Sequence, residues 1–304
     1  MSDGEFFCFY CGSRNVRLAY AKKFHRLKQD HGPFDFYVCA SCGSGLTLPP
    51  PEPAALAALY AAFEFGLSKS TRELLADNPT AVWHDTCVRR IVKLCGYERN
   101  AAFTWLDVGA GGGEIARRFA EHFPGSQGLA IDIHDRPPGL IGGPGNLKWR
   151  RIDIACDALA AELATKADLV FAVGVWEHVR RPDIFARNLL SLLNPNGVLY
   201  LETPNYGSVA RRVMGQYWPY FLPGEHLCMP TLKGARLCLS REFANLNNER
   251  GLAAVWARPI LLRYSARFVL AKFAMPRLAR WLPANLFVHL PSGAMESVAR
   301  VGLQ

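Results

Sequence analysis

Two carboxylates and a run of glycines near the middle of the chain are the residues best placed to do chemistry. Asp107 ends an apolar run, Gly109, Gly111 and Gly113 follow it, and Asp132 closes the next apolar run. Glycines let the backbone pass close to a ligand because no Cβ stands in the way. A carboxylate at Asp107 repels phosphate but attracts an amino group, and a carboxylate about 20 residues further along is placed to hold a ribose diol. The pattern predicts a ligand with an amino group and a ribose, and no phosphate.

The elements that must position these residues are a buried strand and a helix. Phe103, Trp105 and Val108 are aromatic or branched, as strand residues often are, and the glycines then end the strand. From Glu114 apolar residues recur at helical spacing until Pro124 stops them. Strand, glycine turn and helix form a nucleotide-binding unit, in which the helix start offers backbone N–H groups to a ligand.

The spacing D-x-G-x-G-x-G from Asp107 to Gly113 resembles motif I of the class I SAM-dependent methyltransferases, where SAM is S-adenosylmethionine. It differs from the G-x-G-x-x-G of a dinucleotide-binding turn. The resemblance implies that SAM binds at Asp107, Gly109, Gly111, Gly113, Asp132 and Asp153. The last of these would hold the adenine amino group, and a plain helix N-cap is its alternative role.

The chain after the glycine turn follows the order of the same family. Strands and helices alternate, including an uncharged strand over 169–175, and this alternation predicts a parallel sheet. Two later strands, at 252–260 and 295–303, resemble the antiparallel pair that completes the family's sheet. The predicted fold is therefore an α/β, Rossmann-like, doubly wound sheet of seven strands with a small N-terminal zinc-binding module.

Four cysteines near the N-terminus have the spacing of a metal site. Cys8 with Cys11, and Cys39 with Cys42, form two C-x-x-C-G knuckles. Each tight turn aims two thiolates at one ion, so the pair predicts a tetrahedral zinc site. Because all four ligands come from the protein, the zinc should be structural. A redox pair is the alternative, but it would favour a C-x-x-C that opens a helix, and turns surround both knuckles.

Proline clusters and periodicity divide the chain into a zinc-ribbon-like module at 1–50, a helical linker or pocket cap at 51–100, and a methyltransferase domain at 101–304. The N-terminal part of the chain, called the head below, contains two C-x-x-C-G knuckles, a Pro-x-Pro and a helix with Tyr60 and Phe63. This head resembles the zinc-ribbon-bearing SAM methyltransferases of bacterial sugar, polysaccharide and natural-product pathways, and is similar to the sugar C-methyltransferases. The resemblance implies a small glycosyl or natural-product acceptor.

Two histidines are candidates for removing a proton from the acceptor. His178 follows the 169–175 strand, and His226 lies in LPGEHL, which resembles the family's Glu-His-Leu loop on the acceptor side. An imidazole can take a proton from a hydroxyl at neutral pH, and the neighbouring Glu177 and Glu225 could orient it. The candidate catalytic residues are thus His226, His178 and Glu225. The alternative is that the histidines only hold loops in place.

The sequence also allows two other functions. A zinc head on a basic chain also suits an RNA-base methyltransferase, and the patch YAKKFHRLK gives this modest support. The sequence AVGVWEH stands where methylases of nucleobase amines carry [N/D]-P-P-[Y/F], so nucleic acid is an unfavoured partner. A non-catalytic zinc-binding adaptor is the third hypothesis, and the intact glycine motif argues against it.

The net charge of +9 is concentrated near the C-terminus. From Arg258 onward the chain has seven Arg or Lys and one Glu, and a basic amphipathic insertion at about 261–292 carries most of them. This segment suits an anionic membrane surface, where a lipid-linked glycosyl substrate would lie, but equally a lid or a dimer contact. The N-terminus lacks a signal-peptide pattern and no run suits a spanning helix, so we expect a cytoplasmic protein, with peripheral contact at the inner face of the membrane as the variant.

Overall fold

The main sheet of the computed structural model has seven strands. The structure describes residues 6–20, 35–56, 83–137, 140, 143–154, 158–222, 224–246, 251–267, 281–283 and 285–302. In spatial order the strands are β10 (Leu252–Ser265), β11 (Phe287–Val301), β8 (Leu193–Pro204), β7 (Ala167–Val173), β4 (Thr104–Val108), β5 (Gln127–Asp132) and β6 (Leu147–Arg151). Strand β11 runs antiparallel to both neighbours and the other pairs are parallel. The predicted doubly wound, seven-stranded sheet is confirmed.

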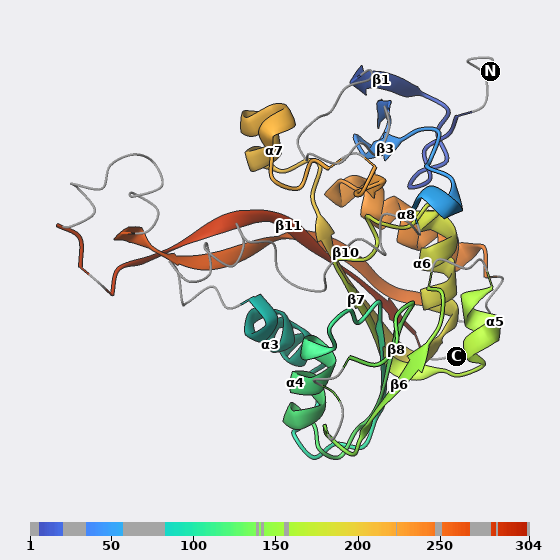
Figure 1. The fold of residues 1–304 in the computed structure, drawn as a ribbon, viewed down its shortest axis with the longest axis vertical. Coiled ribbons are helices and arrows are strands. Elements are labelled where there is room, and N and C mark those ends of the chain that lie inside the picture. Colours follow the sequence, from blue (N-terminus) through green and yellow to red (C-terminus); the bar gives the residue numbers. More distant parts are fainter. Residues whose placement is uncertain are drawn as a thin grey trace.

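Helices cover both faces of this sheet (Figure 1). One face carries α3 (Trp83–Cys95) and α4 (Glu114–His122), and the other carries α5 (Leu159–Leu163), α6 (Pro182–Ser191) and α8 (Leu232–Ala244). Helix α4 starts directly after the glycine turn and buries Ile115 and Phe119 at helical spacing. Helix α6 begins with proline, which suits a first turn because its missing N–H would have no partner there.

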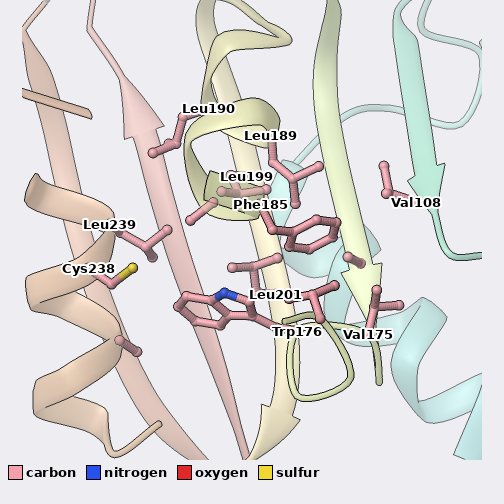
Figure 2. Close-up of a cluster of buried hydrophobic side chains, with 14 of the residues drawn as sticks. Val108, Val175, Trp176, Phe185, Leu189, Leu190, Leu199, Leu201, Cys238 and Leu239 are labelled. Carbon is pink, nitrogen blue, oxygen red and sulfur yellow. The ribbon is translucent and has the colours of Figure 1, made fainter. Parts of the chain in front are cut away.

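The core beneath α6 and α8 is a continuous apolar layer. Figure 2 shows Phe185 and Leu189 of α6 lying over Leu201 of β8, with Trp176 beside them. The indole N–H of Trp176 donates to the carbonyl of Pro182 at 2.9 Å, so this large side chain is buried without an unsatisfied donor. The chain that leaves β7 is therefore fixed at Trp176, directly before Glu177 and His178.

The N-terminal head forms a second, four-stranded sheet. Its order is β1 (Val16–Tyr20), β2 (Phe36–Cys39), β3 (Gly45–Thr47) and β9 (Cys228–Met229). Strand β9 comes from the chain between β8 and α8, some 180 residues after its partner β3. Tyr10 of the head packs edge-on against Trp176, with ring centroids 5.4 Å apart. The head and the main domain thus share one hydrophobic core.

The last two strands run further than the sequence predicts. Pairing between β10 and β11 continues past the sheet as a two-stranded ribbon, from Leu261 opposite Pro291 to Ser265 opposite Phe287. Figure 1 shows the ribbon projecting away from the rest of the molecule. The described ends of the basic segment at 261–292 are therefore strands, and their pairing with each other fixes them.

Some predictions fall outside the described residues. These are most of the helix with Tyr60 and Phe63, most of the basic patch YAKKFHRLK, and the central part of the 261–292 segment. A short helix, α7 (Val209–Met214), and the 3-10 turn η3 (Gly215–Tyr217) follow β8. No described helix combines the length and the apolar character that crossing a membrane requires.

Candidate active site

The glycine turn after β4 requires glycine for both backbone and packing reasons. Gly109, Gly111 and Gly113 have φ values of 75°, 53° and 73°, which side-chain-bearing residues rarely adopt. A Cβ on Gly109 would lie 2.5 Å from a methyl of Val175, and one on Gly113 would lie 2.2 Å from Leu140. No side chain caps the start of α4, so within the described chain the turn brings bare backbone to the helix N-terminus.

Asp107 is a buried carboxylate that lacks a full set of donors. Only 3% of it is exposed, and among the described residues its Oδ2 has no hydrogen-bond partner. Burial raises the pKa of Asp107 well above its usual range, and nearby Asp132 raises it further. A buried oxygen without a donor costs free energy, so this position fits a ligand that brings an N–H or a positive charge. The amino group of SAM is such a donor.

Asp132 ends β5 and organises the turn. Its Oδ2 accepts from Gly111 N–H at 2.8 Å, and its Oδ1 contacts both the backbone N–H and the Nδ1 of His134, at 3.1 and 2.8 Å. His134 was not identified from the sequence. Its position two residues after Asp132 was the available signal, because an aspartate side chain often accepts from the backbone N–H two residues further on. Asp153 is exposed, one residue after Ile152, whose N–H donates to the Asp132 carbonyl. The predicted cofactor residues therefore lie at or just after the carboxyl ends of β4, β5 and β6, which are neighbours in the sheet.

His178, which follows β7, and His226, which precedes β9, lie against each other. Their ring centroids are 4.7 Å apart and their planes are nearly perpendicular. His178 Nδ1 is 3.0 Å from the Glu225 carbonyl, and His226 Nδ1 is 2.7 Å from the Tyr220 carbonyl. The prediction that neighbouring carboxylates orient the rings is corrected by these contacts. Backbone carbonyls hold both Nδ1 atoms, because the loop before β9 turns its peptide groups toward the rings.

The carboxylates beside the histidines take other positions. Glu177 is buried, and its Oε2 accepts from the Thr203 hydroxyl at 2.7 Å, while its Oε1 is 4.0 Å from His178 Nε2. Burial raises the pKa of Glu177 and of Glu225 to about 7. Burial also lowers the pKa of His178 to about 3 and that of His226 to about 4. Both imidazoles are therefore neutral at pH 7.

A second polar group beside this site was missed by the sequence reasoning. Arg90 of α3 donates to Glu202 of β8 at 2.5 Å, and the Tyr200 hydroxyl donates to the same carboxylate at 3.1 Å. Trp83 adds an indole N–H at 3.3 Å. A glutamate within the otherwise apolar strand VLYLETPN was the available signal, because a buried charge must be paired. The group ties α3 to the strand that ends at the acceptor side.

The four cysteines of the head meet at one point. The Cys8 and Cys42 sulfurs are 3.6 Å apart, those of Cys11 and Cys39 are 3.5 Å apart, and all four lie within 4.8 Å of one another. Zinc–sulfur bonds of about 2.3 Å in a tetrahedron place sulfurs about 3.8 Å apart, so the arrangement fits zinc. The two glycines that follow the knuckles have φ values of 74° and 77°, as these tight turns require.

Known proteins resemble this chain over part of its length. Ubiquinone biosynthesis O-methyltransferase of Leptothrix cholodnii is 34% identical over 106 residues, 33% of this chain and 43% of the relative. The protein of the same name from Xanthomonas axonopodis pv. citri is 30% identical over 181 residues, 57% of this chain and 75% of the relative. This chain thus spans less than half the length of the first relative and three quarters of the second.

Solved structures agree at the level of the fold. The CurJ carbon methyltransferase superposes with a TM-score of 0.52 at 16% identity, over 80% of this chain and 61% of that one. A model of the methyltransferase domain family matches residues 72–253, which include the glycine turn, Asp132, Asp153, His178 and His226. On this match, together with the sheet order and the glycine turn, the chain belongs to the family of SAM-dependent methyltransferase domains.

Proposed function

We propose that this protein transfers the methyl group of SAM to a hydroxyl group of a small acceptor, and that His178 and His226 activate that hydroxyl. The observation that carries the proposal is the pair of neutral imidazoles at the end of the cofactor edge, each with its Nδ1 against a backbone carbonyl. A carbonyl oxygen only accepts, so each ring carries its proton on Nδ1 and presents Nε2 as a base or ligand atom.

The cofactor side is assigned to the glycine turn and the three aspartates. Asp107 accepts from the amino group through the oxygen that lacks a donor, Asp132 meets the ribose, and Asp153 meets the adenine amino group, as the family resemblance implies. When bound, SAM supplies a methyl group on a positively charged sulfur. The protein's own contribution is alignment, because direct displacement needs the acceptor atom in line with the sulfur–methyl bond.

The acceptor we propose is a glycosyl or related natural-product hydroxyl. The head and the Glu-His-Leu loop support a glycosyl acceptor by resemblance, and the names of the relatives support oxygen as the receiving atom. His226 has 7% of its surface exposed and Tyr220 stacks beside it, so the site favours a small molecule over a folded nucleic acid. We also propose that the four cysteines bind a structural zinc ion and that the 261–292 segment contacts an anionic membrane surface.

A panel of acceptors tests this function. Purified protein is incubated with SAM and with nucleotide sugars, glycosides, catechol-type phenols or an RNA transcript, and release of S-adenosylhomocysteine is measured. We expect turnover with a glycosyl or other small hydroxyl acceptor, and its loss in His226→Gln. Turnover with RNA alone would replace the proposal by an RNA methyltransferase. Absence of both SAM binding and turnover would favour the adaptor hypothesis.

A further inference from the structure

A cluster of three potential ligand atoms at the acceptor side has the composition of an open metal site. We propose that Glu177, His178 and His226 together bind one divalent transition-metal cation, separate from the zinc of the four cysteines. Their ligand atoms all lie within 4.8 Å of one another, close enough for a single ion to reach each of them after small side-chain adjustments. Two imidazoles and one carboxylate are a common three-residue set for metals that keep a position open for substrate.

The hydrogen bonds of the two imidazoles support this assignment. Metal-binding histidines usually donate their second ring N–H to a carbonyl or carboxylate, which fixes the ring and directs the other nitrogen at the ion. His178 meets the Glu225 carbonyl at 3.0 Å and His226 meets the Tyr220 carbonyl at 2.7 Å, both through Nδ1. Both rings are therefore fixed in the tautomer that offers Nε2 as a ligand. Two rings with the same arrangement, 4.7 Å apart, are unusual if they only fill space.

The charge of the cluster also favours a cation. Glu177 has 3% of its surface exposed, and no Arg or Lys of the described chain lies within ion-pair distance of it. Its second oxygen accepts from the Thr203 hydroxyl at 2.7 Å, which orients the carboxylate but adds no charge. A buried carboxylate without a counter-ion is costly, and a divalent cation would offset that cost.

The loops that carry the three ligands are fixed in advance. Cys228 N–H donates to the Glu177 carbonyl at 3.1 Å, and the Tyr10 hydroxyl donates to the Cys228 carbonyl at 2.9 Å. The chain just after His226 also pairs with the head as strand β9. A metal site needs ligands held in place by their surroundings, and here the end of β7 and the start of β9 are tied directly to each other. Nitrogen ligands select a transition metal over magnesium.

The catalytic consequence rests on the proposed methyl transfer, whereas cation binding does not. An acceptor hydroxyl that coordinated the cation would have a lowered pKa and would give its proton to water. An oxygen electron pair then forms the bond to the methyl carbon, while the pair of the carbon–sulfur bond stays on sulfur as the neutral thioether. Under this scheme His226 acts as a ligand, and the activation of the hydroxyl passes through the ion.

Cobalt titration of the full-length, tag-free protein tests the site directly. Cobalt bound by four thiolates shows strong sulfur-to-metal charge transfer, whereas cobalt bound by imidazole and carboxylate shows only weak visible bands. We expect two cobalt ions per chain, one of each kind. His226→Gln should lose the weak-band ion and keep the thiolate one. His289→Gln, the same change on the exposed ribbon, is the matched control and should keep both.

A second variant guards against a folding defect. Glu177→Gln preserves the shape and an acceptor for Thr203 but removes the charge, so it should weaken cobalt binding at the weak-band site by 10-fold or more while the unfolding temperature stays near that of the wild type. One thiolate-bound cobalt per chain in the wild-type protein, with no second ion, would overturn the inference. Full turnover after selective removal of the second metal would overturn the catalytic role of the ion and leave both the cation site and the methyl transfer standing. A second ion without turnover on any acceptor would instead support the site and contradict the function.

Discussion

The described residues form two clusters of potential metal-ligand side chains, and the clusters differ in how open they are. The first consists of four cysteine sulfurs from two knuckles within the head. The second consists of one carboxylate and two imidazoles from two loops at the carboxyl edge of the main sheet. A tetrahedral ion on four thiolates has no position left for a substrate, whereas an ion on three ligands does. The count of ligands therefore separates a site that stabilises the fold from one that can take part in chemistry.

The two clusters are nevertheless mechanically connected. The cysteine knuckles lie in the head, the head pairs with β9 at Gly45 and Leu46, and β9 begins two residues after His226. The four-cysteine site can therefore affect catalysis only by stabilising the head, whereas the Glu177, His178 and His226 site can contact the substrate directly. Variants of the first should change stability and activity together, and variants of the second should change activity alone.

The largest effect is expected from the closed cluster. Cys39→Ser removes one of four thiolates, and since metal binding is part of folding here, zinc should be lost and the head should unfold. We expect the unfolding temperature to fall by roughly 10 °C or more, the shift that accompanies a loss of about 4 kcal/mol in a domain of this size. Metal analysis and calorimetry measure both effects. Cys95→Ser, outside the cluster, should keep zinc; zinc retained at full stoichiometry in Cys39→Ser would falsify the assignment.

The open cluster should respond in turnover and not in stability. His226→Gln is expected to cut turnover by roughly 100-fold or more, whether the imidazole takes the proton or holds the ion, and to leave SAM affinity unchanged. The His226 ring contacts the Tyr220 carbonyl, whereas the Asp132 carboxylate accepts from Gly111 N–H. His178→Gln should affect both quantities if that side chain also lines the methionine end. If His226→Gln keeps its turnover while His178→Gln abolishes it at unchanged SAM affinity, the roles of the two histidines are reversed.

The cofactor edge should behave independently of both clusters. Asp132→Ala removes the carboxylate predicted to hold the ribose and also frees Gly111 N–H, so SAM binding should weaken by roughly 1 to 3 kcal/mol. Titration calorimetry measures this. Asp135→Ala is the matched control. Asp135 lies three residues after Asp132, and its exposed carboxylate pairs with Arg151, so this variant should bind SAM normally. Equal affinities in the two variants would show that the ribose lies elsewhere.

The smallest effect concerns Asp107 and depends on pH. Its folded-state pKa is raised above the unfolded value because of burial, so the apo fold loses stability as the pH rises through the folded value. Asp107→Asn cannot titrate, so it should gain stability over the wild type as the pH rises, while SAM affinity falls about 10-fold.

Asp168→Asn provides the opposite sign for comparison. Burial would raise the pKa of Asp168, but hydrogen bonds from Thr104 and Asn194 outweigh it and lower the pKa. This carboxylate therefore stabilises the fold above its unfolded pKa, and Asp168→Asn should lose stability at neutral pH relative to acid pH. Denaturant unfolding across the pH range measures both variants. The same pH trend in both would contradict the assignment for Asp107.

Most of the fold could be predicted from the sequence because its signals are local. The run from Phe103 to Glu114 specifies a strand, a turn and a helix by side-chain type alone, and the strands from β5 to β8 that follow it are parallel, as the alternation predicts. The full length of the ribbon could not be predicted. Between 261 and 292 basic and apolar residues fit a helical amphipathic pattern as well as a strand. At the described ends of this segment, the pairing from Leu261 opposite Pro291 to Ser265 opposite Phe287 decides for the strand.

The site could be predicted as residue types but not as contacts. The sequence indicated His178 and His226, and it indicated neighbouring glutamates as their orienting groups. The orienting atoms are instead carbonyls of Tyr220 and Glu225, because a loop conformation, not a residue type, decides where backbone oxygens point. His134 and the pairing of Arg90 with Glu202 were missed for a related reason, since these contacts join segments distant in the sequence or depend on a turn.

The short strand β9 also limits how a chain of this kind can change over generations. It contributes two residues, paired with Gly45 and Leu46, and it places the loop of His226 and the sheet of the head in a single hydrogen-bonded structure. A recombination event that replaced only the first 50 residues would leave this loop without its partner strand. An exchanged head would therefore have to supply a strand that pairs with β9. We expect heads and acceptor-side loops to be inherited as matched sets, so that a new acceptor specificity arises by change within the pair.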